Sequence, residues 1–272
     1  NPIRGAEVQV LDSSGNRIQC GETDAAGAYS VDIPNTGATY TIKINSRSGN
    51  SDSLASVLRN PVSNTYYSLT TTVVANANHP GTDFTAEADE GLDSEVKGGA
   101  FNILDQIYAA NTFLETQLGA SYAANSKVQA YWTAGYSQAP YVGGSATNEV
   151  SFYVAGTNKL YILGGILGDV DSSDTDHFDD SVILHEFGHF LEDNYSVSDS
   201  PGGSHSGTRI IDPRLAWSEG FASFVSSYIR SDPIYKDTYG HSGGVTGFSY
   251  YYDIDLNEDD SGNTLDDINS TD

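Results

Sequence analysis

The chain has 272 residues and a formal net charge of −25, from 37 acidic and 12 basic side chains. A charge of this sign repels phosphate backbones, which excludes nucleic acid as a partner, and no stretch reaches the roughly 20 apolar residues that span a membrane. Strong acidity keeps a protein soluble outside the cell, so we expect a secreted or cell-surface protein. The sequence begins without Met and without a signal segment, which indicates a piece of a longer precursor.

Residues 1–80 show the alternation of apolar and polar side chains that is typical of β-strands. Turn signals recur roughly every 8–12 residues, as in an antiparallel sandwich. The predicted strands are Glu7–Leu11, Arg17–Gln19, Tyr29–Ile33, Tyr40–Ile44 and Tyr66–Ala75.

The order of these strands and turns resembles a known module. The series strand, Asp-x-x-Gly, strand, Thr-Asp-x-x-Gly-x-Tyr, strand, Pro, strand is similar to the carboxypeptidase-regulatory-like or transthyretin-like β-sandwich over about 45 residues. The resemblance implies an all-β sandwich domain over residues 1–80 with an accessory role beside an enzyme. Any other small β-sandwich is the alternative.

Residues 81–272 are predicted to form an α+β domain. Apolar side chains recur with a helical period from Ser94 to Leu118, and Gly119 ends this helix. Two further helices follow a group of strands, an order typical of α+β domains. Residues 253–272, rich in Asp, Asn and Ser, are typical of a linker or a truncated end. The predicted strands are Val128–Trp132, Val150–Val154 and Lys159–Leu163.

The chemistry is concentrated in His185-Glu186-Phe187-Gly188-His189, an HExxH pattern. Residues four apart share one face of an α-helix, so both imidazoles can bind one zinc ion. Glu186 lies beside that face and can accept a proton from the attacking water. The HExxH pattern also arises by chance, but two further features favour a zinc site.

The first feature is a carboxylate on the next predicted helix. Asp212 is the expected N-cap, and Glu219 is an acid inside an otherwise apolar helical run. The alternative for a buried Glu is a structural hydrogen bond or an ion pair. A catalytic zinc ion takes three protein ligands and leaves a fourth position for water, so His185, His189 and Glu219 would complete the set.

The second feature is a family resemblance. His-Glu-x-x-His followed some 30 residues later by Glu-Gly-x-Ala resembles the gluzincins, and residues 178–224 resemble a group of exported bacterial metallopeptidases. This implies a zincin-like zinc peptidase domain. In thermolysin-like enzymes an Asp four residues after the ligand Glu orients a ligand His, but Ser223 stands at that position here. We therefore expect Asp176, Asp179 or Asp180 to orient a ligand histidine.

Peptide hydrolysis also needs a hydrogen-bond donor to the tetrahedral oxyanion. We predict His241 or Tyr252 as the catalytic donor, although each is alternatively an ordinary core or surface residue. The other candidates are His205, Tyr239, Tyr250 and Tyr251.

Two segments before the HExxH helix carry further signals. Residues 160–165 form either an edge strand that pairs with an extended substrate or an ordinary inner strand. A run of acids could bind Ca²⁺ but lacks the EF-hand spacing, and a solvated loop is the favoured alternative. These acids are Asp169, Asp171, Asp174 and Asp176.

Together these features predict a secreted endopeptidase that acts on peptides or proteins, with Zn²⁺ as its cofactor and Ca²⁺ as a second candidate ion. An aminopeptidase would use the same chemistry, but it needs an acidic anchor for the free amine that the sequence does not clearly show. The alternative from another class is a non-catalytic surface or adhesion module with a structural zinc ion, whose site would be closed by four protein ligands. The sequence predicts no oligomeric state.

Overall fold

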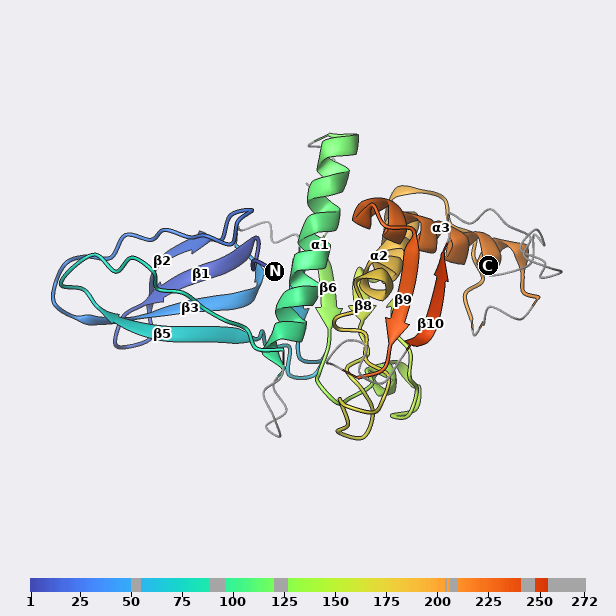
Figure 1. Ribbon diagram of the computed structural model, residues 1–272, viewed down its shortest axis with the longest axis horizontal. Helices are drawn as coiled ribbons and strands as arrows, with labels where there is room; N and C mark the ends of the chain where they lie inside the picture. Colours follow the sequence, from blue (N-terminus) through green and yellow to red (C-terminus); the bar gives the residue numbers. More distant parts are fainter. Residues whose placement is uncertain are drawn as a thin grey trace.

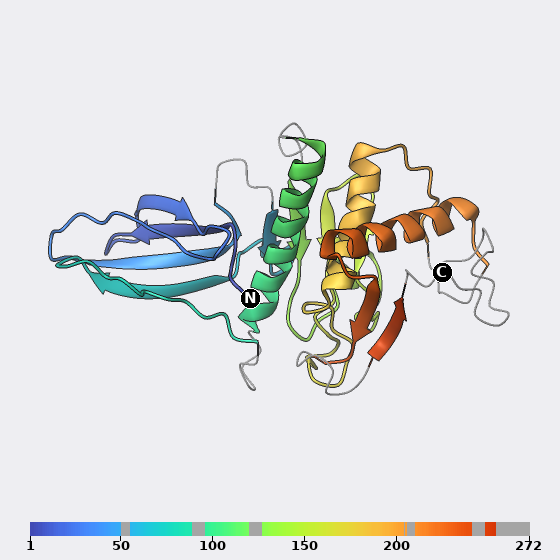
Figure 2. The ribbon, with the colours of Figure 1, turned by 45° about the horizontal axis from the view of Figure 1, so that its top comes forward.

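The computed structural model describes residues 1–49, 55–88, 96–119, 127–203, 205, 210–240 and 248–253, the last of these as backbone only. A mixed sheet with strand order β2-β1-β3-β4-β6-β8-β7 runs through much of the molecule, and β5 pairs with β3. Helix α1 (Lys97–Leu118) stands between the N-terminal strands and the part that holds α2 and α3 (Figure 1, Figure 2). This mixture of helices and sheet agrees with the expected α+β class.

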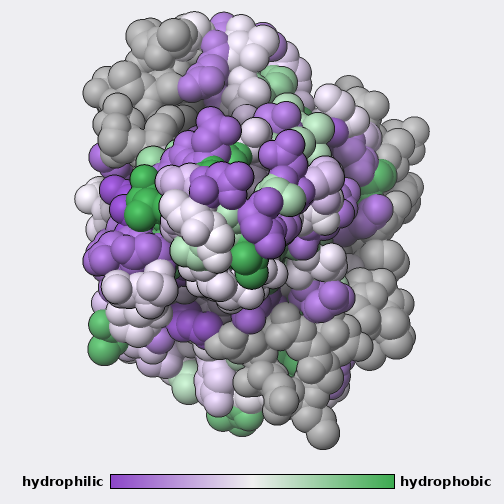
Figure 3. Space-filling model, turned by 90° about the vertical axis from the view of Figure 1, so that its left-hand side faces the viewer, coloured by the Kyte–Doolittle hydropathy of each residue, from purple (hydrophilic) through white to green (hydrophobic). Residues whose placement is uncertain are grey.

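The N-terminal strands form an antiparallel sheet around β3 (Thr39–Ser48). Strand β1 (Ala6–Leu11) pairs with β2 (Arg17–Glu22) and with β3, and β5 (Ser68–Val74) pairs with the other edge of β3. Four of the five strands predicted for this region are thereby confirmed. The end of the molecule that these strands form is mostly hydrophilic, with apolar side chains in small separate patches (Figure 3).

The fifth predicted strand, Tyr29–Ile33, pairs with no strand among the described residues. Its apolar side chains Tyr29, Val31 and Ile33 still alternate with exposed ones and pack against the core. An alternating pattern predicts which side chains face the core, and an extended segment satisfies it without a strand partner. The described strands of residues 1–80 thus make one sheet, not the two facing sheets of the expected sandwich.

Strand β4 (Ala55–Leu58) connects the two halves of the sheet. It meets β3 at the pair Arg47 and Ser56, and it runs parallel to β6 (Val128–Tyr131) over its whole length. Because β4 precedes residue 80 and β6 follows it, the sheet continues across the predicted domain boundary. The division of the chain at residue 80 stays a prediction.

Strand β8 (Lys159–Tyr161) lies between β6 and β7 (Phe152–Val154). It is parallel to β6 and antiparallel to β7. Residues 160–165 therefore do not form an edge strand, and β7 is the terminal strand of the sheet in the described part of the chain. Both strands have similar apolar sequences, so composition could not tell which one lies at the edge.

Helices α2 (Asp180–Tyr195) and α3 (Pro213–Arg230) pack against each other on the far side of α1 from the N-terminal strands (Figure 1). Strands β9 (Ile234–Thr238) and β10 (Phe248–Asp253) form a separate antiparallel pair, with β9 beside α2. Among the described helices, none combines the length and the apolar character that crossing a membrane requires.

Candidate metal centre

Helix α2 presents both histidines of the HExxH pattern on one face. The apolar residues between and beside them, such as Phe187 and Phe190, are fully buried and hold the helix in the core. The side chains of His185 and His189 are 13% and 16% exposed, and their Nε2 atoms lie 3.1 Å apart. The predicted pairing of the two rings, one helical turn apart, is present.

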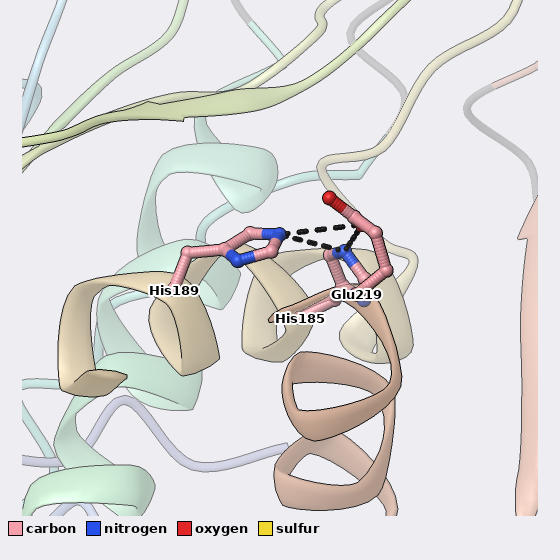
Figure 4. Close-up of side chains that lie close together, drawn as sticks. All are labelled: His185, His189 and Glu219. Atoms are coloured by element: carbon pink, nitrogen blue, oxygen red, sulfur yellow. Dashed lines mark hydrogen bonds and ion pairs between the residues drawn. The ribbon is translucent and has the colours of Figure 1, made fainter. Parts of the chain in front are cut away.

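Helix α3 brings a carboxylate to the same place. As predicted, the side chain of Asp212 caps the helix by accepting a hydrogen bond from the backbone N–H of Arg214 at 2.9 Å. Glu219 is 6% exposed, and its Oε2 lies 3.1 Å from His185 Nε2 and 3.4 Å from His189 Nε2 (Figure 4). Helices α2 and α3 therefore bring three potential ligand atoms, two imidazole nitrogens and one carboxylate oxygen, close to a single point.

These distances fit a small tetrahedral cation. Nitrogen and oxygen ligands at about 2.0–2.1 Å from one zinc ion lie about 3.3 Å from each other. The separations between His185, His189 and Glu219 are 3.1, 3.1 and 3.4 Å. The three residues could hold a metal ion.

The hydrogen bonds behind the rings support the same conclusion. Ser218 Oγ donates to Glu192 Oε2 at 2.5 Å, so its contact of 3.2 Å with His189 Nδ1 must be one in which Nδ1–H donates. In a neutral ring this leaves the lone pair on Nε2, the atom that faces Glu219, which is the state that a metal ligand requires. The donor set therefore fits a metal.

The residues that contact the backs of the rings differ from those predicted. Ser218 contacts His189, and Ser223, which stands in place of the orienting Asp of thermolysin-like enzymes, lies 3.2 Å from His185 Nδ1. The predicted orienting acids are wrong, since these serine hydroxyls lie at the two Nδ1 atoms. Asp176 accepts from Ser151, Asp179 from Thr238 and Asp180 from Asn102.

Glu186 is 7% exposed and lines a pocket of about 230 Å³ together with His185 and Glu219. Burial raises the pKa of its carboxyl, and the histidines and a backbone hydrogen bond from Tyr153 on β7 act in the opposite direction. A carboxyl with a raised pKa beside a pocket is suited to accept and return a proton near neutral pH.

Of the predicted oxyanion donors, His205 is found at the site. Its Nε2 lies 3.2 Å from Glu219 Oε2, and its Nδ1 lies 3.0 Å from the carbonyl oxygen of Gly203. The hydrogen bond to Glu219 raises the pKa of His205 to about 9. His241 lies outside the described residues, and Tyr252 is described as backbone alone, within β10.

Tyr235 is a pocket residue that sequence reasoning missed. It is buried on β9, and its ring centroid lies 5.9 Å from that of His185 with the planes at 84°. Tyr235 and Asp237 both line the pocket, whereas Lys236 between them is exposed. The alternation along β9 is the signal that could have identified both residues.

The acids considered for Ca²⁺ do not form one site. Asp169 is half-buried and accepts hydrogen bonds from the backbone of Asp171 and Ser172 within a local turn. Asp174 and Asp176 are buried instead and lie close to Asp237 on β9. Sequence reasoning could not find this group because α2 and α3 separate its members along the chain.

Comparison with known proteins places helices α2 and α3 inside the range that a family model matches. The family model described as the mycolysin C-terminal domain matches residues 120–264, just over half of the chain. An uncharacterized protein of Archaeoglobus fulgidus is 46% identical over 59 residues, which are 20% of this chain and 17% of that protein. The chain thus aligns with a small part of that relative's length. The comparison with solved structures gave no match.

Proposed function

The chain belongs to the mycolysin C-terminal domain family, a domain of secreted zinc metalloproteases, and we propose that it is a secreted, zinc-dependent endopeptidase of the HExxH type. The observation that carries the proposal is the approach of His185 Nε2, His189 Nε2 and Glu219 Oε2 to within 3.1–3.4 Å of one another. The family match supports it because residues 120–264 include α2 and α3.

His185, His189 and Glu219 would hold the ion. When bound, zinc supplies a Lewis acid that makes water a nucleophile near neutral pH. Among the described residues, three side chains at this point have ligand atoms that all lie close to one another. Three protein ligands suit an open catalytic site better than a structural site, which four protein ligands close.

Glu186 would act as the general base. It accepts a proton from the attacking water and returns it to the leaving amine, and its raised pKa favours this exchange. His205, which lies beside Glu219, would turn its Nε2–H from that carboxylate to the developing oxyanion. His241 and Tyr252 stay as predicted alternatives for that role.

An extended substrate would pair with β7. This strand ends the sheet in the described part of the chain, and Val150 and Ser151, which precede it, line the pocket. An edge strand offers unpaired backbone groups to a peptide, so β7 can position the scissile bond without contacts to particular side chains. This arrangement favours cleavage within a chain over removal of a terminal residue.

The decisive experiment replaces Glu186 with Gln. We expect one bound zinc per chain in the wild type and in the variant, measured by elemental mass spectrometry, and an about 10²–10⁴-fold loss of casein hydrolysis in the variant. Glu115→Gln on α1 is the control and should keep both properties.

The alternative classes give other results. A wild type that binds zinc but cleaves neither casein nor a proteome-derived peptide mixture would favour a non-catalytic zinc module. Release of single residues from free N-termini would favour an aminopeptidase.

A further inference from the structure

A second group of acids lines the pocket that holds the proposed zinc ligands. Asp174, Asp176 and Asp237 each place a carboxylate oxygen within 4.8 Å of the other two. Asp174 is 8% and Asp176 is 2% exposed. One oxygen of each of these two carboxyls, Oδ1, is buried without a hydrogen-bond partner. Buried acceptors of this kind are costly unless a donor or a cation satisfies them.

The charges around these oxygens are of one sign. Burial, the charge of Asp237 and a hydrogen bond shared with that carboxyl together raise the pKa of Asp174 to about 8, and the nearby acids Asp179 and Glu149 contribute in the same direction. Burial and the charges of Asp237, Asp174 and Asp179 also raise the pKa of Asp176, against the hydrogen bond from Ser151. The nearest basic residue along β9, Lys236, is exposed while its neighbours face the pocket. A bound cation would offset this repulsion between like charges.

We propose that Asp174, Asp176 and Asp237 bind a calcium ion, at a site separate from the proposed zinc ligands. The donors are all oxygens, which suit a hard cation, whereas zinc favours nitrogen and sulfur. Calcium holds six to eight oxygens at about 2.3–2.6 Å, so two oxygens on one ion lie at most about 5 Å apart. The spacing of the three carboxylates lies within that limit.

Two neighbouring groups complete the surroundings. Glu149 Oε1 lies 3.5 Å from the backbone nitrogen of Asp174, which places a fourth carboxylate at the pocket. Ser151 Oγ donates to Asp176 Oδ2 at 2.5 Å and leaves Oδ1 for the ion.

The ion would join three segments that wall the pocket. Asp174 and Asp176 lie on the loop before α2, Asp237 lies on β9, and Ser151 lies just before β7. The loop and the end of β9 already meet at the bridge between Asp174 and Tyr239. Calcium would therefore hold β7 and β9 at fixed positions beside α2 and stabilise the whole chain. This inference does not depend on peptidase activity.

The test uses the full chain loaded with zinc, so that added ions cannot enter the first site. Calcium binding is measured by titration calorimetry and by displacement of Tb³⁺ luminescence, and the melting temperature is recorded with and without Ca²⁺. We expect a rise of about 5 °C or more at a Ca²⁺ concentration 100 times the Kd, and little effect of Mg²⁺, which retains its waters.

Asp176→Asn and Asp237→Asn should each weaken Ca²⁺ binding at least 10-fold, and without Ca²⁺ each should melt no lower than the wild type, because one repelling charge is gone. Asp171→Asn, an exposed acid of the same loop, is the matched control and should bind Ca²⁺ normally. The proposal is overturned if the wild type binds no Ca²⁺, or if Asp171→Asn weakens binding as much as Asp176→Asn. It is also overturned if Asp176→Asn keeps Ca²⁺ binding and loses only cleavage of peptides with free N-termini, since the acids would then anchor an amine.

Discussion

Gly188 on α2 lies so close to Ala222 on α3 that a Cβ atom at position 188 would stand 2.7 Å from the Ala222 Cα. The atoms that such a Cβ would meet are the backbone and the Cβ of Ala222, which cannot rotate away, so the two helices would have to move apart as whole bodies. It sets the separation of the helices one turn from the point where Glu219 meets the two histidines. The glycine inside the HExxH pattern thus fixes the position of Glu219 relative to the two histidines.

Gly188→Ala should therefore separate the helices and disturb the site. We expect a loss of about 1–3 kcal/mol of stability from overpacking and, for a shift of ~1 Å, an about 100-fold loss of hydrolysis. Urea unfolding and casein cleavage measure the two effects. Gly220→Ala is the control, because that position is exposed with nothing within 4 Å of a new Cβ, and it should raise stability slightly. If the two variants show the same stability and the same casein cleavage, Gly188 does not set the separation of the helices.

Ser218 connects the ring of His189 to the carboxylate of Glu192. Removal of the Ser218 hydroxyl would leave His189 Nδ1 without this contact, and it would take away the hydrogen bond that Ser218 donates to the buried Glu192 carboxylate. Ser218→Ala should weaken zinc binding about 10–100-fold, as is usual when the group behind a ligand is lost. Competition with a chromogenic chelator measures the affinity.

Ser226→Ala gives a matched control for this variant. The Ser226 hydroxyl is also buried on α3 and donates to the carbonyl oxygen of Ser181 on α2. Its loss should cost about 1 kcal/mol of stability and leave the zinc affinity unchanged. If Ser226→Ala weakens zinc binding as much as Ser218→Ala, the effect is one of helix packing and not of histidine orientation.

The parts of the site that were predicted from sequence are those encoded within one helix. The four-residue spacing of His185 and His189 and the cap at Asp212 are local patterns, and both are present. The meeting of Ser218 with Glu192 depends on how α3 is rotated against α2, which no local pattern records. For this reason the sequence favours acids near the HExxH helix as orienting groups, whereas in the structure two serines contact the histidine rings.

In the sheet, too, local patterns were predictable and the pairing of distant strands was not. Alternation along β1, β3 and β5 predicted which side chains face the core, because burial on one face is a local property. It could not predict that Tyr29–Ile33 lacks a strand partner or that β8 lies inside the sheet, because pairing is a relation between distant segments. The sequence could not group Asp237 with Asp174 and Asp176 for the same reason, since those two acids precede α2 whereas Asp237 follows α3.

His205→Ala separates an open site from a closed one. If His205 donates to the oxyanion, the variant keeps its zinc and loses hydrolysis by about 10²–10³-fold. If His205 is instead a fourth ligand, zinc affinity falls together with activity, and the structural alternative gains support. Zinc content and casein cleavage are measured on the same samples. His79→Ala, at an exposed histidine of the N-terminal region, should change neither.

The stability of the metal-free chain should fall as the pH rises from about 4 to 7. Burial raises the pKa of Asp179 to about 7, against the hydrogen bonds from Thr238 and with the help of the nearby acids Asp237 and Asp180. In the unfolded chain the same carboxyl has a pKa near 3.9. Between these values the folded state binds the extra proton, so the stability present below the lower pKa is lost as the pH passes the higher one.

Urea unfolding in EDTA at pH 5 and pH 8 measures this dependence. The buried carboxyls of Asp174 and Asp176 act in the same direction, because their pKa values are also raised. Asp179→Asn should therefore reduce the difference between the two pH values without abolishing it, and the amide oxygen can still accept the hydrogen bonds from Thr238. Asp171→Asn, an exposed acid, should leave the difference unchanged. A metal-free wild type that is more stable at pH 8 than at pH 5 would mean that these carboxyls are not buried as described, because an ionised group in that environment cannot favour folding without a cation.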